Sequence, residues 1–341
     1  MIRWEIKKLF KNKSIIISSI IFVLLCSMMS FFKPDLETEN NYFDKYGNYV
    51  QDNRAKNVIA NEKLVNKVTE LETLDKANKS NKLDDISKKM ANMASEKLQK
   101  DNGKNYKDIS FYKVFNFRIN NAFSGFVIVG ICVYIFSNIY TDEKLSNVDS
   151  IILSGKNKYK ALFSKLSLAI IAPIFIYLVY ILAIGVITSI QYGNPINGSL
   201  QAYRIVDTFS LLKPITIYGY NMVNILTMMI VFVSVGVFAS LFSFITNNSV
   251  QSIVSVTVFI VIGKIIASLK FLPKNLLAVV GCSNYIDIIM NPQMLIGNYL
   301  GDINVFGKSI GIVNVGYIGL IVILMIGIVS NIYVFKKVLN T

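Results

Sequence analysis

Runs of about twenty apolar residues recur along this chain and restrict the folds that it can adopt. The two clearest runs occupy residues 121–140 and 161–190, on either side of a short polar segment. A run of this length can cross a bilayer as a helix, and only helices and closed barrels satisfy their backbone hydrogen bonds there. The composition agrees, since 53% of the 341 residues are hydrophobic and only 16% are charged. We therefore expect an integral membrane protein rather than a soluble domain.

Four further runs complete the pattern of an all-α polytopic membrane protein with six transmembrane helices. Residues 1–13 are basic and amphipathic, which indicates a helix lying at the membrane interface. The run at residues 14–32 is long enough to span, and no small-x-small cleavage site follows it, so a retained span is favoured over a signal peptide. The other spans are predicted within residues 218–245, 250–272 and 315–335.

Residues 33–113 interrupt the apolar pattern and predict a helical hairpin between the first two spans. The segment holds 16 Lys or Arg and 14 Asp or Glu, so it is densely charged but nearly neutral. Apolar residues recur at helical spacing on either side of a turn predicted at residues 78–81; they are Val65, Val68, Leu71 and Leu74 before it, and Leu83, Ile86, Met90, Met93 and Leu98 after it. The hairpin is either a contact for a substrate or an accessory protein, or a spacer.

These segments divide the chain into three parts. Residues 1–32 hold the interfacial helix and the first span, residues 33–113 hold the hairpin domain, and residues 114–341 hold the membrane domain. Within the last part, residues 273–314 are too polar and too often interrupted by Gly and Pro to form a span. Short apolar stretches at 276–280 and 286–290 predict helices that dip back into the membrane before the sixth span.

The distribution of charge predicts the orientation of the spans. With both termini in the cytoplasm, the inner segments hold 12 basic residues against four acidic ones, Glu5, Asp142, Glu143 and Asp149. Cytoplasmic loops of membrane proteins carry such an excess of Lys and Arg. We therefore expect both termini and the 141–160 loop inside, and the hairpin outside. The net charge of +14 follows from these membrane flanks, so we expect no nucleic-acid partner.

The polar segment between the second and third spans, residues 140–165, is predicted to be a loop with a distinctive order of charged and apolar residues. The acidic pair Asp142-Glu143 comes first, and we expect it to bind a basic residue, for example from the first helix. Residues 148–153 then predict a short amphipathic helix, whose large aliphatic residues would form an apolar knob or rest on the membrane surface; they are Ile151, Ile152 and Leu153. We expect the lysines that follow to face lipid phosphates or acidic residues of a partner; they are Lys156, Lys158 and Lys160.

This segment resembles the cytoplasmic loop of ABC-2 type permeases, the membrane subunits of ABC exporters. In that family a Glu precedes a short helix that reads ILLS, and a small residue, a basic residue and a Lys follow the helix. In this chain Lys165, in the pair Ser164-Lys165 that opens the third span, takes the place of that final Lys. The family's short helix is a coupling helix that binds in a groove of the ATPase subunit. The loop departs from the family at Gly155-Lys156, where Pro often follows the helix. The resemblance implies that the ATPase-coupling residues are Asp142, Glu143, Ser150, Ile151, Ile152, Leu153, Ser154, Gly155, Lys156 and Lys160.

The resemblance also implies a function and partners. The chain would be the permease subunit of an ABC-2 type exporter in the plasma membrane, paired with an identical or a related second permease. It would be no enzyme and hold no cofactor, because a separate ATPase subunit would bind ATP with magnesium and hydrolyse it. The segment before the last span resembles the re-entrant helices of that family. Apolar spans without carboxylates favour an amphipathic substrate, such as a peptide antibiotic, a drug or a lipid-like molecule.

Other functions are less well supported by the residues. Gly307-Lys308-Ser309 resembles the end of a phosphate-binding loop, but Asp302 stands where that loop needs Gly. The absence of Asp and Glu from the spans argues against a secondary transporter driven by protons or sodium. Lys264 lies inside the fifth span, and we favour extension of its side chain to the interface over a functional role. The main alternative is a non-transporting sensor or scaffold whose outer hairpin binds a peptide or an envelope component.

Overall fold

The computed structural model is mostly helical, with 76% of the residues in helices. It describes residues 2–43, 45–78, 85–101, 105–206, 213–269, 272–296, 300–305 and 308–340. Two short antiparallel hairpins add a little sheet; they pair β1 (Asn41–Phe43) with β2 (Tyr49–Gln51) and β3 (Asp302–Val305) with β4 (Lys308–Gly311). The sequence analysis missed both hairpins, because strands of three or four residues are too short to show an alternating pattern.

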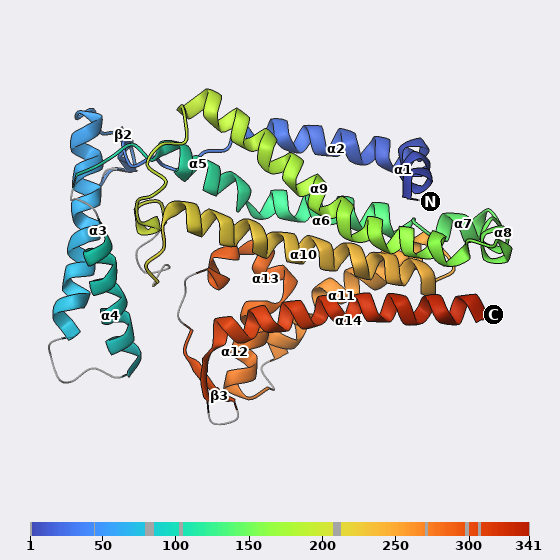
Figure 1. Ribbon diagram of the computed structural model, residues 1–341. Helices are drawn as coiled ribbons and strands as arrows, with labels where there is room; N and C mark the ends of the chain where they lie inside the picture. The colour runs from blue at the N-terminus through green and yellow to red at the C-terminus, as the bar shows by residue number, and fades with distance from the viewer. Residues whose placement is uncertain are drawn as a thin grey trace.

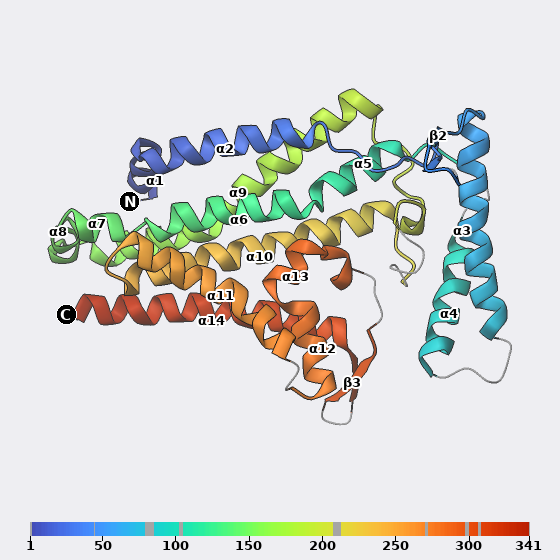
Figure 2. The same cartoon turned by 180° about the vertical axis from the view of Figure 1, so that it is seen from behind.

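Long helices run side by side and form a bundle (Figures 1 and 2). They are α2 (Lys13–Met29), α6 (Ala122–Ser137), α9 (Lys158–Tyr192), α10 (Ile217–Ile245), α11 (Ser249–Leu269) and α14 (Ile312–Asn340). The central helix is α10, which packs against α6, α9, α11 and α14 and is buried throughout residues 231–241. A Cβ on Gly236 would lie 2.6 Å from the carbonyl oxygen of Ala169 in α9, so this glycine lets the two backbones approach closely.

Five helices in the described part of the chain are long and apolar enough to cross a membrane, which indicates a membrane protein; they are Ala122–Leu145, Lys158–Tyr192, Ile217–Ile245, Ser249–Leu269 and Ile312–Lys337. Each overlaps one of the five spans predicted after residue 114. The first predicted span corresponds to α2, which follows α1 (Ile2–Lys11) at an angle of 73°. Counting that bent pair as one span brings the number to six.

The two ends of the bundle carry different structures (Figures 1 and 2). Both termini lie at one end, together with α1, α7 (Thr141–Leu145) and α8 (Asp149–Ser154). The other end carries α3 (Lys56–Asn78), α4 (Asp85–Lys100) and the β3–β4 hairpin. The segments predicted to be cytoplasmic thus share one end, and the segments predicted to be outside share the other.

The helices α3 and α4 pack against each other and stand apart from the bundle (Figure 1). Leu64, Val68 and Leu71 of α3 form their shared core with Ala94 of α4. Val65, predicted in this seam, is instead 53% exposed, because the seam follows Leu64 and Val68, four residues apart. Leu83 and most of the predicted turn, within residues 79–84, lie outside the described residues.

Buried polar contacts join the α3–α4 pair to the bundle. Tyr203, from η1 (Ala202–Arg204) before α10, packs into the core of the pair. Arg204 donates a hydrogen bond to Asp101 at 2.8 Å, and Lys67 of α3 donates to the Arg204 carbonyl at 3.0 Å. The predicted boundary after residue 113 falls within α5 (Ser110–Ile119), which packs against α9 and so continues into the bundle.

Short helices occupy the segment before α14, where the sequence predicts them. They are α12 (Lys274–Ser283), α13 (Tyr285–Met290) and the 3₁₀ turn η2 (Pro292–Leu295). Lys264 of α11 donates to Oδ1 of Asp287 in α13 at 2.5 Å. The Lys264 side chain is 44% exposed and pairs with α13, which packs against α11, so its expected extension to the outer interface stays a prediction.

Candidate functional site

Four consecutive residues tie neighbouring helices together at the end of the bundle that carries both termini. Thr141, Asp142, Glu143 and Lys144 open α7, which begins shortly after α6 ends at Ser137, and we call them the α7 junction. Their partners lie in or beside α1, α9, α10 and α11. The sequence analysis singled out only the acidic pair in this group.

Glu143 is the centre of a buried ion network. Its Oε1 accepts hydrogen bonds from Lys8 of α1 at 2.5 Å and from Lys165 of α9 at 2.6 Å. Lys165 also donates to Oε1 of Glu5 in α1 at 2.9 Å. The side chains of Glu5, Glu143 and Lys165 are each at most 3% exposed. Two lysines and two glutamates thus balance in charge, which buried ions require, and the network joins α1, α7 and α9.

The expected pairing of the acidic residues with the first helix is confirmed for Glu143. Asp142 has a different contact, because its Oδ2 accepts a hydrogen bond at 2.9 Å from the amide of Asn12, between α1 and α2. The same Asn12 side chain accepts from the backbone N–H of Ser14 and so caps the start of α2. The bend between α1 and α2 is therefore held directly by the α7 junction.

Lys144 and Thr141 hold the ends of α10 and α11. Lys144 Nζ donates to the carbonyls of Phe244 and Thr246 at 2.7 and 2.8 Å, where α10 ends. The last carbonyls of a helix lack partners within it, and a cation there is favourable. The backbone N–H of Thr141 donates to Ser243 of α10, and its hydroxyl is 2.9 Å from the hydroxyl of Ser249 in α11. The junction thus reaches every long helix of the bundle except α14.

A tight turn connects the junction to α8. Asn147 adopts a left-handed backbone conformation, with φ of 55°, which Asn tolerates better than most residues. The backbone N–H of Val148 then donates to the carbonyl of Glu143 at 2.9 Å. The start of α8 is therefore attached to the same residue that centres the ion network.

The predicted short helix exists as α8 (Asp149–Ser154), and none of its residues is buried. Ile151 is 68% exposed, while Ile152 and Leu153 are half-buried. Ser150 and Ser154 donate to the carbonyls of Asn147 and Ile151, so both hydroxyls serve the local helix. The helix α8 lies at the end of the bundle (Figure 1), and of the three aliphatic residues only Ile151 is exposed there.

Gly155 ends α8 with φ of −72° and ψ of 145°. That conformation is open to any residue and is close to the φ that proline imposes. The backbone N–H of Gly155 donates to the carbonyl of Ile152 at 3.3 Å, a hydrogen bond that a proline at this position could not make.

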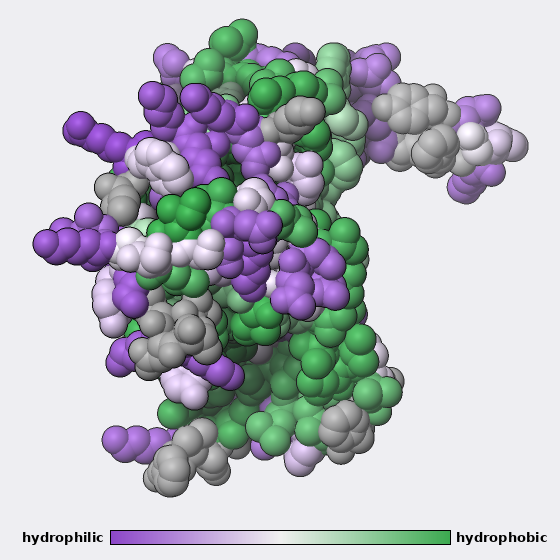
Figure 3. All heavy atoms as spheres, turned by 90° about the vertical axis from the view of Figure 1, so that its right-hand side faces the viewer, coloured by the Kyte–Doolittle hydropathy of each residue, from purple (hydrophilic) through white to green (hydrophobic). Residues whose placement is uncertain are grey.

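Lysines surround the knob on its C-terminal side. Lys156 and Lys160 are exposed, the first in the turn after α8 and the second in the first turn of α9. Figure 3 views this end of the molecule and shows hydrophilic residues exposed beside hydrophobic ones. A surface that mixes an apolar protrusion with cations suits a partner groove that is apolar inside and acidic at its rim.

Several residues of this site were not in the predicted set. Glu5 and Lys8 lie on the basic first helix, and a lone acid among cations was the only signal that Glu5 has a buried partner. Lys165 is part of the loop pattern described from the sequence, but only the fold shows that its side chain is completely buried. Ser243 and Asn12 carry no signal in the sequence alone.

No protein-family model, curated protein or solved structure matches this chain.

Proposed function

We propose that this chain is the permease subunit of an ABC-2 type exporter, in which α8 binds a separate ATPase subunit. The observation that carries the proposal is that α8, with its exposed Ile151, directly follows a junction bonded to α1, α9, α10 and α11. Ile151 offers the partner an apolar contact, and Val148 and Glu143 connect that contact to the buried ion network.

In this proposal the α7 junction converts movement of α8 into movement of the bundle. ATP binding draws two ATPase subunits together and displaces α8. Glu143 passes the displacement to α1 and α9 through Lys8 and Lys165, and Lys144 passes it to the end of α10. The chain itself hydrolyses no ATP, and ATP with magnesium belongs to the partner.

The rest of the proposed arrangement follows the charge distribution. The bent α1–α2 pair supplies the first of six spans, both termini face the cytoplasm, and the α3–α4 pair lies outside the plasma membrane. The helices α12 and α13 are re-entrant. A second permease, identical or related, completes the path for an amphipathic substrate such as a peptide antibiotic, a drug or a lipid-like molecule.

The test is the substitution Ile151→Asp, with Ile196→Asp as its matched control. Ile196 is an exposed isoleucine too, at 53%, but it follows α9 near the opposite end of the bundle. We expect Ile151→Asp to lose the ATPase on purification from native membranes while the chain stays folded, and Ile196→Asp to keep it. Equal retention of the ATPase by both variants would contradict the proposal.

The second candidate, a sensor or scaffold, is favoured by one observation. The α3–α4 pair packs around a small core that is separate from the main core of the bundle and that also includes Tyr203, and the pair stands beside the bundle, as a ligand-binding module would. That candidate needs no ATPase, so the same purification separates the two functions.

A further inference from the structure

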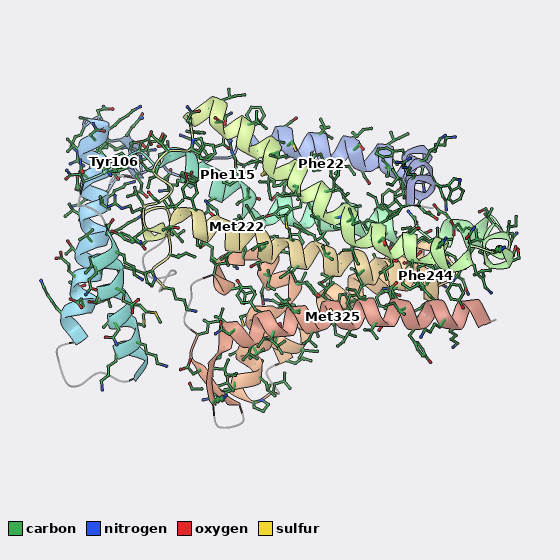
Figure 4. All side chains as sticks on the ribbon, in the orientation of Figure 1. Phe22, Tyr106, Phe115, Met222, Phe244 and Met325 are labelled. Carbon is green, nitrogen blue, oxygen red and sulfur yellow. The ribbon has the colours of Figure 1, made fainter. Side chains whose placement is uncertain are left out.

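A groove opens on the side of the bundle between α6 and α11, two helices that can be followed in Figure 2. Val129 and Val133 of α6 line one wall, and Ile260 of α11 lines the other. Among the described residues, none of α2 or α14, which carry the labelled Phe22 and Met325 in Figure 4, lines this groove. Its volume of about 440 Å³ falls within the usual range of small-molecule sites.

The groove has room because α6 carries a glycine there. Gly130 is exposed, and no described atom lies within 4 Å of a Cβ built on it. Phe126 of α6 and Thr257 of α11 also line the groove and are exposed. A ligand can therefore enter this groove from the side of the bundle, directly out of the surrounding lipid.

A charged side chain lies on the stripe of α11 that lines the groove. Lys264 comes four residues after Ile260 and three after Val261, both of which are in the groove wall, and this spacing keeps residues on one helical face. Its partner Asp287 comes directly after Ile286, the residue that α13 contributes to the same wall. The ion pair therefore marks the outer end of the groove, because α11 runs away from the end of the bundle that carries both termini (Figure 1).

The two members of this pair differ in how far their hydrogen bonds are satisfied. Oδ2 of Asp287 also accepts from Nδ2 of Asn284 at 2.7 Å, and the backbone N–H of Asp287 donates to Oδ1 of Asn284 at 2.9 Å. A Cβ on Gly263 would lie 2.8 Å from Cβ of Asn284, so this glycine lets α13 approach α11.

The ammonium group of Lys264 has three N–H groups and uses one of them, toward Asp287, among the described residues. The Lys264 side chain is 44% exposed and that of Asp287 only 15%. A ligand in the groove therefore meets the cation of the pair. An ionisable residue inside a membrane span is a candidate for a functional role by default.

From these features we infer that the groove binds the exported substrate, and that this substrate is a single-chain amphiphile with a carboxylate head group. The two oxygens of the carboxylate accept hydrogen bonds from the two remaining N–H groups of Lys264. The hydrocarbon chain lies between α6 and α11 and reaches Ile253, which lines the groove nearer the other end. One cation at the end of an apolar groove matches one anionic head on one apolar tail. The inference rests on the proposed function for the step of export, but not for binding.

Photolabelling of the purified full-length chain in phosphatidylcholine nanodiscs tests the binding step without any ATPase. The probe is palmitic acid with a diazirine in its chain, used at about pH 9 so that the carboxylate stays ionised in the membrane. The competitors are palmitic acid and hexadecanol, which has the same chain and no charge. We expect adducts within residues 126–134 and 253–261. Palmitic acid should compete at least about tenfold better than hexadecanol, the factor that a hydrogen bond to a charged group supplies.

Variants of the ion pair separate binding from a purely structural role, because they should shift the preference in opposite directions. Lys264→Gln removes the cation and should abolish the preference for palmitic acid, while Lys274→Gln, an exposed lysine of α12, should keep it. Asp287→Asn should increase the preference, because Lys264 then has no competing carboxylate. A pair that served only to hold α13 against α11 would instead weaken both ligands in both variants, and that result would overturn the inference.

A second pair of variants locates the hydrocarbon chain. Gly130→Phe fills the groove and should abolish the labelling, while Gly319→Phe on α14, where a Cβ also has no described atom within 4 Å, should keep it. Labelling that survives Gly130→Phe, or equal competition by the two ligands in the unchanged chain, would overturn the inference. Either result would leave the proposed function standing, because retention of the ATPase by the Ile151→Asp variant tests that function separately.

Discussion

Lys165 and Glu143, 22 residues apart in the sequence, meet with 2.6 Å between Nζ and Oε1, and both side chains are buried. The contact closes the loop that carries α8, because Glu143 precedes that helix and Lys165 follows it. Whatever moves α8 therefore acts on two helices that already share a buried ion pair.

The first prediction is that Lys165→Met destabilises the folded chain by about 3–5 kcal/mol, because Glu143 and Glu5 are left with one lysine in a buried site. Thermal unfolding of the purified protein measures the effect. Lys160→Met, earlier on α9 and exposed, should change the stability by no more than about 0.5 kcal/mol. Unfolding of the two variants at the same temperature would contradict the structural role of the network.

The second prediction concerns the closest approach of two helices. Gly236→Ala should cost about 1–3 kcal/mol of stability, because the new methyl group would meet the Ala169 carbonyl oxygen and Pro173 in α9. Gly319→Ala on α14 is the control, since no atom lies within 4 Å of a Cβ there. Thermal unfolding should therefore separate the two alanine variants, and a loss confined to Gly319→Ala would contradict the packing.

Much of this fold could be predicted from the sequence, because the membrane makes apolar length a direct signal of a helix. The five later spans and the short helices before α14 are found close to where the apolar runs place them. The buried seam of α3 was harder to predict, since Leu64 and Val65 are adjacent in the sequence and only the packing against α4 decides which of them is buried.

The candidate site was predictable in its outer part and not in its inner part. Aliphatic residues within a polar loop, such as Ile151, can be recognised from the sequence alone. For Glu143 the sequence predicted a partner from the first helix, but not which lysine. Its second partner, Lys165, was not predicted, because it lies on another helix and the chain holds many other lysines. Lys264 shows the same limit, since its partner Asp287 depends on how α13 packs against α11.

The third prediction is a loss of stability in acid at the base of the α3–α4 pair. Burial alone would raise the pKa of Glu37, but Lys67 and Lys113 outweigh it and hold this pKa below its ordinary value of 4.5. A lowered carboxyl pKa stabilises the folded state above the unfolded pKa, and the contribution is lost as the pH falls through the folded pKa.

Hydrogen exchange along α3 measures this effect. Exchange should speed up in the wild-type chain as the pH falls below about 4, after correction for the intrinsic rate. Glu37→Gln should exchange faster at neutral pH and lose most of that acid dependence. The same pH dependence in both proteins would show that Glu37 does not carry it.

The fourth prediction concerns the orientation in the membrane. In a chain whose cysteines are replaced, Ser154→Cys should react with a membrane-impermeant thiol reagent only after the cells are opened. Val65→Cys, exposed on α3, should react in intact cells, since the α3–α4 pair is expected outside. Labelling of Ser154→Cys in intact cells would contradict six spans with both termini inside.

The most direct measurement is a photo-crosslink from α8 in native membranes. A benzophenone amino acid in place of Ile151 should form a covalent adduct with an ATP-binding subunit, identified by mass spectrometry. The same amino acid in place of Ile196, exposed near the other end of the bundle, should not. Adducts from position 151 that contain only lipid would show that α8 rests on the membrane surface, and would contradict its role as the contact with an ATPase.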